Sequence, residues 1–252
     1  MENISKFTLN GLKTSDLEDF YITFKAFLKD KSKDAFIITV NKSSSDMLEQ
    51  INFMDKLTVK DAKQYISLGQ EIFNEVYDAK KIVIGVADGF IFDGYFEFLL
   101  VCDLFFSTKN SVFGFPCVNT GIIPSFGSIK LLCRGIFEQF VKYLLLTGTM
   151  IDVKSLYDKG IINDVFEDIR KCQDYIGTLS IDLLNKSKFA LGLAKESINH
   201  SLFASLDDAL LIEQNAFCLS FSDDDKIEGI KAFIEKRQPN FKSRWEDIYN
   251  VL

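Results

Sequence analysis

The sequence predicts an α/β core that is followed by a helical C-terminal region. Two short apolar runs, at residues 35–40 and 82–87, are typical of buried strands, and stretches of helical periodicity precede and separate them. From residue 129 onward helical periodicity dominates to the end of the chain. With 252 residues, 47% of them hydrophobic, the chain can bury the core of one large domain or of a domain with an appendage.

Two amphipathic helices are predicted in the first third of the chain. Ser15 followed by Glu18 is typical of a capping box, and the apolar residues after it recur at helical spacing up to residue 28. A second helix is predicted after the first strand, where Thr58 and Asp61 can cap its start. The order of elements is therefore helix, strand, helix, strand.

The chain is expected to turn from the second strand into a helix around Gly94. That helix runs towards Val101, and residues 104–107 form another short strand. Residues 113–126 hold two of the three prolines, which favours an ordered loop over a regular element. The sequence shows no low-complexity tract and no internal repeat.

The composition argues against several classes of protein. The net charge is −7 and the 29 lysines and arginines form no dense run, so we expect neither nucleic acid nor a membrane as a partner. The 5 cysteines lack CxxC spacing, which predicts reduced thiols and a cytoplasmic protein. The single histidine, His200, cannot anchor a usual zinc site, so no metal is expected. The most apolar stretch, residues 89–106, is interrupted by acids and is not expected to span a bilayer.

Gly94 and Glu97 are the candidate site residues that local sequence indicates. A strand that passes through glycine into a helix leaves backbone N–H groups free at the helix start, where negative charge is stabilised. Glu97 follows one turn later among apolar residues, which should raise its pKa towards the range useful for proton transfer. The alternative is a helix-start glycine and a first-turn acid that the helix dipole favours.

Three separated blocks of the sequence share their pattern with a known family. Residues 81–134 contain a strand, a glycine turn before an acid, a Cys-Asp pair, FGFP and GIIPSFG; residues 147–166 read TGTMIDVKSLYDKGIINDVF; residues 225–241 read DKIEGIKAFIEKRQPNF. In this order they resemble the signature of the crotonase (enoyl-CoA hydratase/isomerase) superfamily. The resemblance covers most of the chain.

The resemblance implies a crotonase (ClpP/crotonase-like) fold, which is a spiral of repeated ββα units with C-terminal helices that mediate trimers. We expect residues 1–190 to form the α/β spiral core. Residues 191–252 are expected to form a C-terminal helical oligomerisation region, which implies a homotrimer or a hexamer. No cofactor is implied, because coenzyme A arrives as part of the substrate.

The resemblance also implies roles for individual residues. The Gly94 N–H and the N–H of Ser45, in the segment SSSDMLE, correspond to the two donors of the family's oxyanion hole. Glu97 corresponds to the first of two catalytic glutamates. Phe217 and Lys236 match positions that contact the adenine and phosphates of coenzyme A, often from a neighbouring subunit; an ordinary exposed charge is the alternative for Lys236.

Two positions depart from the family pattern and are the other candidate catalytic residues. Cys117 stands where the second catalytic glutamate is expected, and it is either a nucleophile or weak acid, or a small buried side chain that fills the place of the lost acid. Asp93 stands beside the oxyanion glycine, where the family prefers glycine. An ionised carboxylate there would oppose an enolate unless it points away or stays protonated.

The function that the resemblance implies is that of an enoyl-CoA hydratase/isomerase, a lyase or isomerase of fatty acid metabolism, with a single glutamate as acid and base. One carboxylate suits a proton shuttle between carbons better than addition of water, yet family isomerases keep an acid at the position of Cys117, so the choice stays open. A decarboxylase or dehydratase on an acyl-carrier-protein thioester is the second hypothesis. The third is a catalytically degenerate paralogue that binds without turnover, which Asp93 and Cys117 favour and Gly94 and Glu97 oppose.

Overall fold

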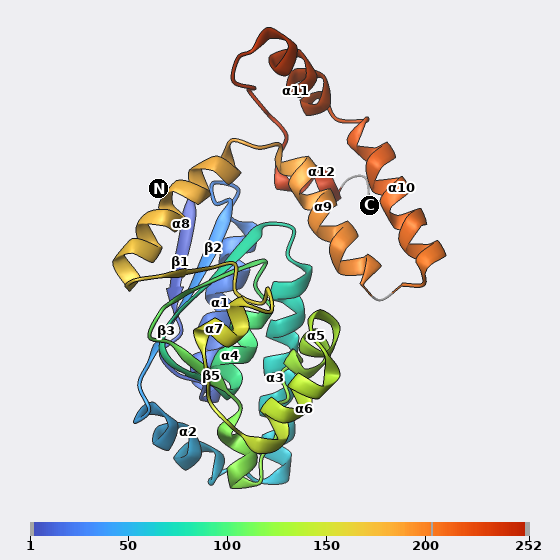
Figure 1. The fold of residues 1–252 in the computed structure, drawn as a ribbon. Helices are drawn as coiled ribbons and strands as arrows, with labels where there is room; N and C mark the ends of the chain where they lie inside the picture. Colours follow the sequence, from blue (N-terminus) through green and yellow to red (C-terminus); the bar gives the residue numbers. More distant parts are fainter. Residues whose placement is uncertain (1–2, 203, 250–252) are drawn as a thin grey trace. The chain divides into compact units, whose positions relative to one another are not determined.

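The computed structural model describes residues 3–202 and 204–249 and shows an α/β core with helices towards the C-terminus, as the sequence predicts (Figure 1). The chain divides into two compact units, of which the first ends at Tyr175 and the second begins at Ile176. The boundary predicted between residues 190 and 191 falls inside helix α9 (Lys188–Ser201) of the second unit. The oligomerisation role predicted for residues 191–252 stays a prediction.

The first unit is built on a mostly parallel sheet in the order β1-β2-β3-β4-β7. The long strand β3 pairs with β2 and β4 through its first part and with β5 through Phe90–Phe92, and β5 in turn pairs with β6 antiparallel. Strand β3 thus joins the pairing with β2 and β4 to the pairing with β5, and it ends at the candidate site. The strands are β1 Ile4–Thr8, β2 Ala35–Lys42, β3 Ile82–Phe92, β4 Leu104–Thr108, β5 Val112–Gly114, β6 Ile151–Asp152 and β7 Asp164–Phe166.

Helices follow most of these strands along the chain. Those of the first unit are α1 Thr14–Lys29, α2 Asp46–Met54, α3 Val59–Asp78, α4 Asp93–Leu100, the 3₁₀ helix η1 Pro116–Thr120, α5 Ser128–Gly135, α6 Glu138–Thr147 and α7 Val153–Tyr157. Helix α8, Ile169–Leu184, runs across the division at Tyr175, and the second unit continues with α9, α10 Leu206–Ser220, α11 Asp224–Glu235 and α12 Trp245–Tyr249.

The capping prediction is confirmed for α3 and wrong for α1. Thr58 precedes α3, where its Oγ1 accepts from the Asp61 N–H at 3.3 Å and its own N–H donates to the Asp61 carboxylate at 3.0 Å. Helix α1 begins at Thr14, because the Lys13 N–H donates to the Asp16 carboxylate at 2.8 Å and closes the turn earlier than a cap at Ser15 would. The segment predicted as a loop at 113–126 also differs, since it contains the end of β5 and all of η1.

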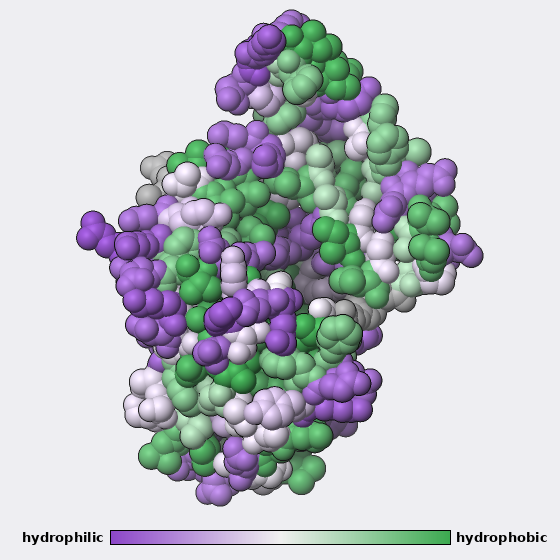
Figure 2. Space-filling model, viewed as in Figure 1, coloured by the Kyte–Doolittle hydropathy of each residue, from purple (hydrophilic) through white to green (hydrophobic). Residues whose placement is uncertain are grey.

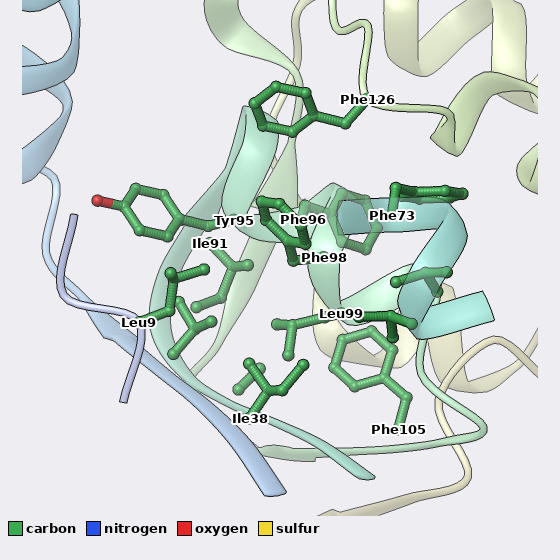
Figure 3. Packing of buried hydrophobic residues seen from close by; sticks show 14 of the residues in the cluster. Leu9, Ile38, Phe73, Ile91, Tyr95, Phe96, Phe98, Leu99, Phe105 and Phe126 are labelled. Carbon is green, nitrogen blue, oxygen red and sulfur yellow. The ribbon is translucent and has the colours of Figure 1, made fainter. Parts of the chain in front are cut away.

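Phenylalanine side chains fill the core around α4. Figure 3 shows Phe98 and Leu99 of α4 among Ile38 and Phe105 of the sheet. Phe96 and Phe98 are buried, and Phe96 packs against aromatic rings of the β5 region. Because α4 is buried from Gly94 to Leu99, the core holds its start in a defined position at the candidate site.

The helices of the second unit carry an unusual number of exposed apolar side chains. Helix α10 has no buried residue, and Figure 2 shows apolar residues at the surface of α10 and α11. Among residues 3–202 and 204–249, none of the helices combines the length and the apolar character that crossing a bilayer requires. The exposed apolar residues of α10 and α11 include Leu206, Leu210, Leu211, Phe217, Ile227, Ile230, Phe233 and Ile234.

Candidate active site

A cavity of about 490 Å³ opens in the first unit between α2, α3, α4 and the segment from Pro116 to Phe126. Its wall is mainly apolar, and the polar groups in it are few, as is typical of sites that bind organic ligands. Of the residues that the sequence predicts, Asp93, Gly94, Glu97 and Cys117 all line this cavity. The apolar wall includes Met47, Ile51, Met54, Leu57, Ile66 and Ile122.

The turn from β3 into α4 places Asp93 and Gly94 at the cavity. Asp93 is the first residue of α4 and has φ 46°, a left-handed value that aspartate tolerates better than most residues with a side chain. A Cβ atom at Gly94 would lie 2.7 Å from the Phe126 ring and 2.9 Å from Leu12. Gly94 is therefore required by close packing as well as suited to the approach of a ligand carbonyl, so a side chain there would disturb the core before it tested binding.

Glu97 is held by donors from one loop. Its Oε2 accepts hydrogen bonds from the N–H groups of Phe126 (2.9 Å), Gly127 (3.2 Å) and Ser128 (3.3 Å) and from the Ser128 hydroxyl (2.8 Å). Its Oε1 accepts from the Ser125 N–H at 3.2 Å. The carboxylate thus caps the start of α5, where helix N–H groups favour negative charge.

Burial and hydrogen bonding act on Glu97 in opposite directions. The side chain is 2% exposed, and this burial raises the pKa of Glu97, while the N–H and hydroxyl donors stabilise its ionised form and lower the pKa. Burial is the larger effect, so the pKa of Glu97 is raised, as the sequence predicts. The sequence did not indicate the loop that holds Glu97, because its partners lie some thirty residues further along the chain.

Asp93 is the second carboxyl group of the cavity. Its Oδ1 accepts a hydrogen bond from the Cys117 N–H at 3.1 Å. Burial raises the pKa of Asp93 to about 6, and the nearby charge of Glu97 adds to the rise. Asp93 and Glu97 are four residues apart on α4, and both line the cavity.

Cys117 does not have the surroundings of a reactive thiol. Burial raises the pKa of Cys117, and the charges of Asp93 and Glu97 raise it further, so the thiol stays protonated at neutral pH. The histidine that could act as its base, His200, lies on α9 of the second unit and pairs with Glu196 at 3.7 Å. In the described part of the chain no group of three or more His, Cys, Asp or Glu side chains could hold a metal ion.

The remaining predicted residues are not among those that line this cavity. Ser45 is exposed just before α2 and lines a separate depression with Lys13 and Glu49. Phe217, 66% exposed on α10, and Lys236, the C-cap of α11, belong to the second unit. The roles of all three in binding a thioester stay predictions.

The α/β fold and the cavity at the start of α4 agree with the crotonase class that the sequence resembles. The enoyl-CoA hydratase/isomerase family model matches residues 5–244, and the chain belongs to that family. The chain is 30% identical over 237 residues to the crotonyl-CoA hydratase of Syntrophomonas wolfei, covering 94% of this chain and 91% of the relative. It is 28% identical over 238 residues to the short-chain-enoyl-CoA hydratase of Clostridium acetobutylicum, with the same coverage.

Solved structures confirm the fold that the resemblance implied. An enoyl-CoA hydratase from Bacillus anthracis has a TM-score of 0.87 to this chain at 21% identity, and each chain is covered to 96%. An enoyl-CoA hydratase from Geobacillus kaustophilus has a TM-score of 0.85 at 24% identity, covering 96% of this chain and 95% of the other. The chain is thus an enoyl-CoA hydratase/isomerase-like protein with a crotonase fold.

Proposed function

We propose that the protein hydrates or isomerises an enoyl-CoA, with the backbone at Gly94 stabilising the enolate and Glu97 acting as acid and base. The observation that carries the proposal is a buried, ionisable carboxylate one helical turn from Gly94, in an apolar cavity large enough for an acyl chain. The family and the hydratases that the chain resembles support the same substrate class.

The start of α4 supplies the electrostatic part of this chemistry. Backbone N–H groups in the first turn of a helix have no partner within the helix, and they stabilise negative charge that develops on a thioester oxygen. The absence of a side chain at Gly94 lets the carbonyl approach this backbone. Ser45 as the second donor rests on the resemblance, and it requires the segment before α2 to move towards the cavity when substrate binds.

The two carboxylate oxygens of Glu97 differ in the number of hydrogen bonds that they accept. Oε2 accepts the donors of Phe126, Gly127 and Ser128, whereas Oε1 accepts one N–H. A carboxylate oxygen can accept further hydrogen bonds, so Oε1 has capacity for a water molecule or a substrate proton. The loop thus orients Glu97 while leaving one oxygen for chemistry.

A binding protein without turnover is the second candidate function. The observation that favours it is that Glu97 caps α5, which by itself accounts for a buried carboxylate at this position. A decarboxylase or dehydratase on a carrier-protein thioester remains the third, since nothing in the cavity distinguishes coenzyme A from a carrier protein. Phe217 and Lys236 would contact coenzyme A across subunits in a trimer.

The test is an assay of crotonyl-CoA, a 3-enoyl-CoA and a malonyl-type thioester side by side with the parent and Glu97→Gln. Glutamine keeps its amide oxygen at the Oε2 position, so four of the five hydrogen bonds survive. Turnover should fall about 10²- to 10⁴-fold while acyl-CoA binding by calorimetry persists. Undiminished turnover of a confirmed substrate in Glu97→Gln would exclude Glu97 as the acid and base.

A further inference from the structure

The cavity holds a carboxylate beside the position from which one is missing. The family resemblance places the second catalytic acid at position 117, where the chain has cysteine. In the structure the Cys117 N–H donates to the carboxylate of Asp93 at 3.1 Å, and both residues line the cavity. The start of α4 thus brings a carboxyl group next to the position on η1 from which the acid is absent.

Asp93 and Glu97 form a pair whose members are held differently. Both carboxyl groups line the cavity and the charge of Glu97 acts on Asp93, so ionising both brings like charges together where burial weakens their screening. Glu97 accepts five hydrogen bonds, and Asp93 accepts the single N–H of Cys117 together with its thiol. These hydrogen bonds favour the negative charge on Glu97, and Asp93 keeps its proton up to a pH of about 6.

The titratable groups that act on Asp93 come from three elements. Glu97 lies on its own helix, Cys117 lies on η1, and the buried Tyr65 lies on α3. Tyr65 and Cys117 are neutral at physiological pH, because burial raises the pKa of each. Glu97 is the member of this set whose ionised form accepts five hydrogen bonds, and a charge on it favours the protonated form of Asp93.

A thioester bound with its carbonyl oxygen at the Gly94 backbone would bring its reacting carbons near the carboxyl groups of α4. If the carbonyl oxygen lies at the Gly94 backbone, the α-carbon lies next to the first turn, where Asp93 is the neighbour of Gly94. The β-carbon lies further along, towards Glu97. Each carboxyl group then faces one of the two carbons between which water is added.

We propose that Asp93 is the second catalytic acid, which exchanges the proton at the α-carbon while Glu97 acts on the water that adds at the β-carbon. This inference rests on the proposed enoyl-CoA hydratase function. The Glu97 carboxylate takes a proton from water as the oxygen forms a bond to the β-carbon, and the π pair of the C=C bond moves to the thioester carbonyl. The enolate then collapses and takes the Asp93 proton at the α-carbon. A proton returns from Glu97 to Asp93, and the net reaction is addition of one water.

The backbone at Asp93 decides which variant tests this role. Asparagine tolerates the left-handed φ of 46° as aspartate does and keeps an oxygen that accepts the Cys117 N–H, so Asp93→Asn removes only the proton. Asp93→Gly relieves the strained φ and serves as the second variant if the asparagine variant does not fold. Asp19→Asn, at an exposed acid of α1, is the matched control for the loss of one carboxylate.

The experiment measures the chemistry at the α-carbon and at the β-carbon separately. Hydration of crotonyl-CoA is measured together with exchange of the α-protons of butyryl-CoA in D₂O, a partial reaction that adds no water. Asp93→Asn should lose about 10²- to 10⁴-fold in both reactions, whereas Glu97→Gln should lose hydration and keep exchange. Asp19→Asn should match the parent in both. The parent's hydration rate should fall as the pH rises through the pKa of Asp93, and this limb should be absent from Asp93→Asn.

The outcomes distinguish this inference from the proposed function. If Asp93→Asn exchanges α-protons at the parental rate while the parent hydrates crotonyl-CoA, Asp93 is not the acid and the enoyl-CoA function stands. The same holds if Glu97→Gln loses exchange and Asp93→Asn keeps it, since the α-proton then belongs to Glu97. If the parent neither hydrates an enoyl thioester nor exchanges α-protons, both proposals are wrong.

Discussion

Asp93 has a left-handed backbone conformation and a partly buried carboxyl group. Each of these two features lowers the stability of the folded protein. Residues held in such conformations cluster at functional sites, where the surrounding structure enforces them. Burial raises the pKa of Asp93 to about 6 from an ordinary 3.8, so the folded protein binds this proton more tightly than the unfolded chain does. By linkage, the contribution of Asp93 to stability is favourable at low pH and is lost as the pH rises through about 6.

Asp93→Asn should therefore stabilise the protein at pH 8 relative to the parent. Asparagine stays neutral, so it avoids the cost of ionising a carboxyl group in the cavity, which we expect to be about 1 to 3 kcal/mol. At pH 4 the parent's Asp93 is protonated when folded, and most of this difference should disappear. Denaturant unfolding of both proteins at the two pH values measures the effect. An equal difference in free energy at both would mean that ionisation of Asp93 does not destabilise the fold.

Cys117→Ala should reduce turnover by less than about tenfold, because a thiol with a raised pKa is neither a thiolate nucleophile nor an efficient acid at neutral pH. Thiol titration of the folded protein provides a second measurement. Cys133 and Cys218 are exposed, so they should react rapidly in the parent and the variant alike. A thiol that reacts faster than these two and disappears in Cys117→Ala would make Cys117 chemically active.

Among the elements, the buried strands were the most predictable. The runs at 35–40 and 82–87 are continuous and apolar, and they became β2 and the first part of β3. The remainder of β3 was not predicted, since Asp88 and Gly89 look like a turn. In the structure Asp88 accepts from the Thr108 hydroxyl at 2.7 Å, and Gly89 has φ 94°, where a Cβ atom would lie 2.3 Å from the Lys42 carbonyl.

The candidate site was predictable in part for a similar reason. Gly94 and Glu97 belong to a local motif within one helix, and they lie together in the cavity. Glu97 contacts the loop before α5, and Asp93 contacts η1. Both contacts join segments that are far apart in the sequence, and local periodicity does not predict such contacts. The position of Ser45 depends on a loop that follows β2, and the structure places it away from the cavity.

Thr58→Ala should lower the free energy of unfolding by about 1 kcal/mol, because it removes the oxygen that accepts an N–H at the start of α3. Helix α3 contributes Tyr65 and Ile66 to the cavity. Acyl-CoA binding by the variant therefore shows whether a change at the start of α3 affects the site. Thr23→Ala is the matched control, since Thr23 lies within α1 and its hydroxyl bonds to the Asp19 carbonyl. The control should be neutral or slightly stabilising. Equal effects of the two changes would show that the cap contributes nothing.

For the whole molecule, the exposed apolar faces of α10 and α11 favour assembly. Large exposed apolar side chains gathered on the same helices are typical of surfaces that associate. We expect a homotrimer, or a dimer of trimers, as the family resemblance implies. The two compact units then have separate tasks: the first holds the cavity, and the second provides the surfaces for association.

Light scattering should give a mass three or six times that of the 28.7 kDa chain. Leu210→Asp, at an exposed position of α10, should shift the mass towards that of a single chain, because it places a charge in the expected interface. Leu48→Asp, at an exposed leucine of α2 in the first unit, is the matched control and should keep the parental mass. A parent that has the mass of one chain at micromolar concentration would rule out a site shared between subunits.

The capping of α5 by Glu97 makes the backbone amides of this loop an internal reporter of the reaction. Whenever Glu97 carries a proton, the N–H groups of Phe126, Gly127 and Ser128 lose much of their electrostatic partner, and the first turn of α5 opens more readily. Hydrogen–deuterium exchange at these amides should therefore quicken when a ligand or an acidic solution protonates Glu97. The protonation state of one side chain can thus be followed from the backbone that holds it, without observing the substrate.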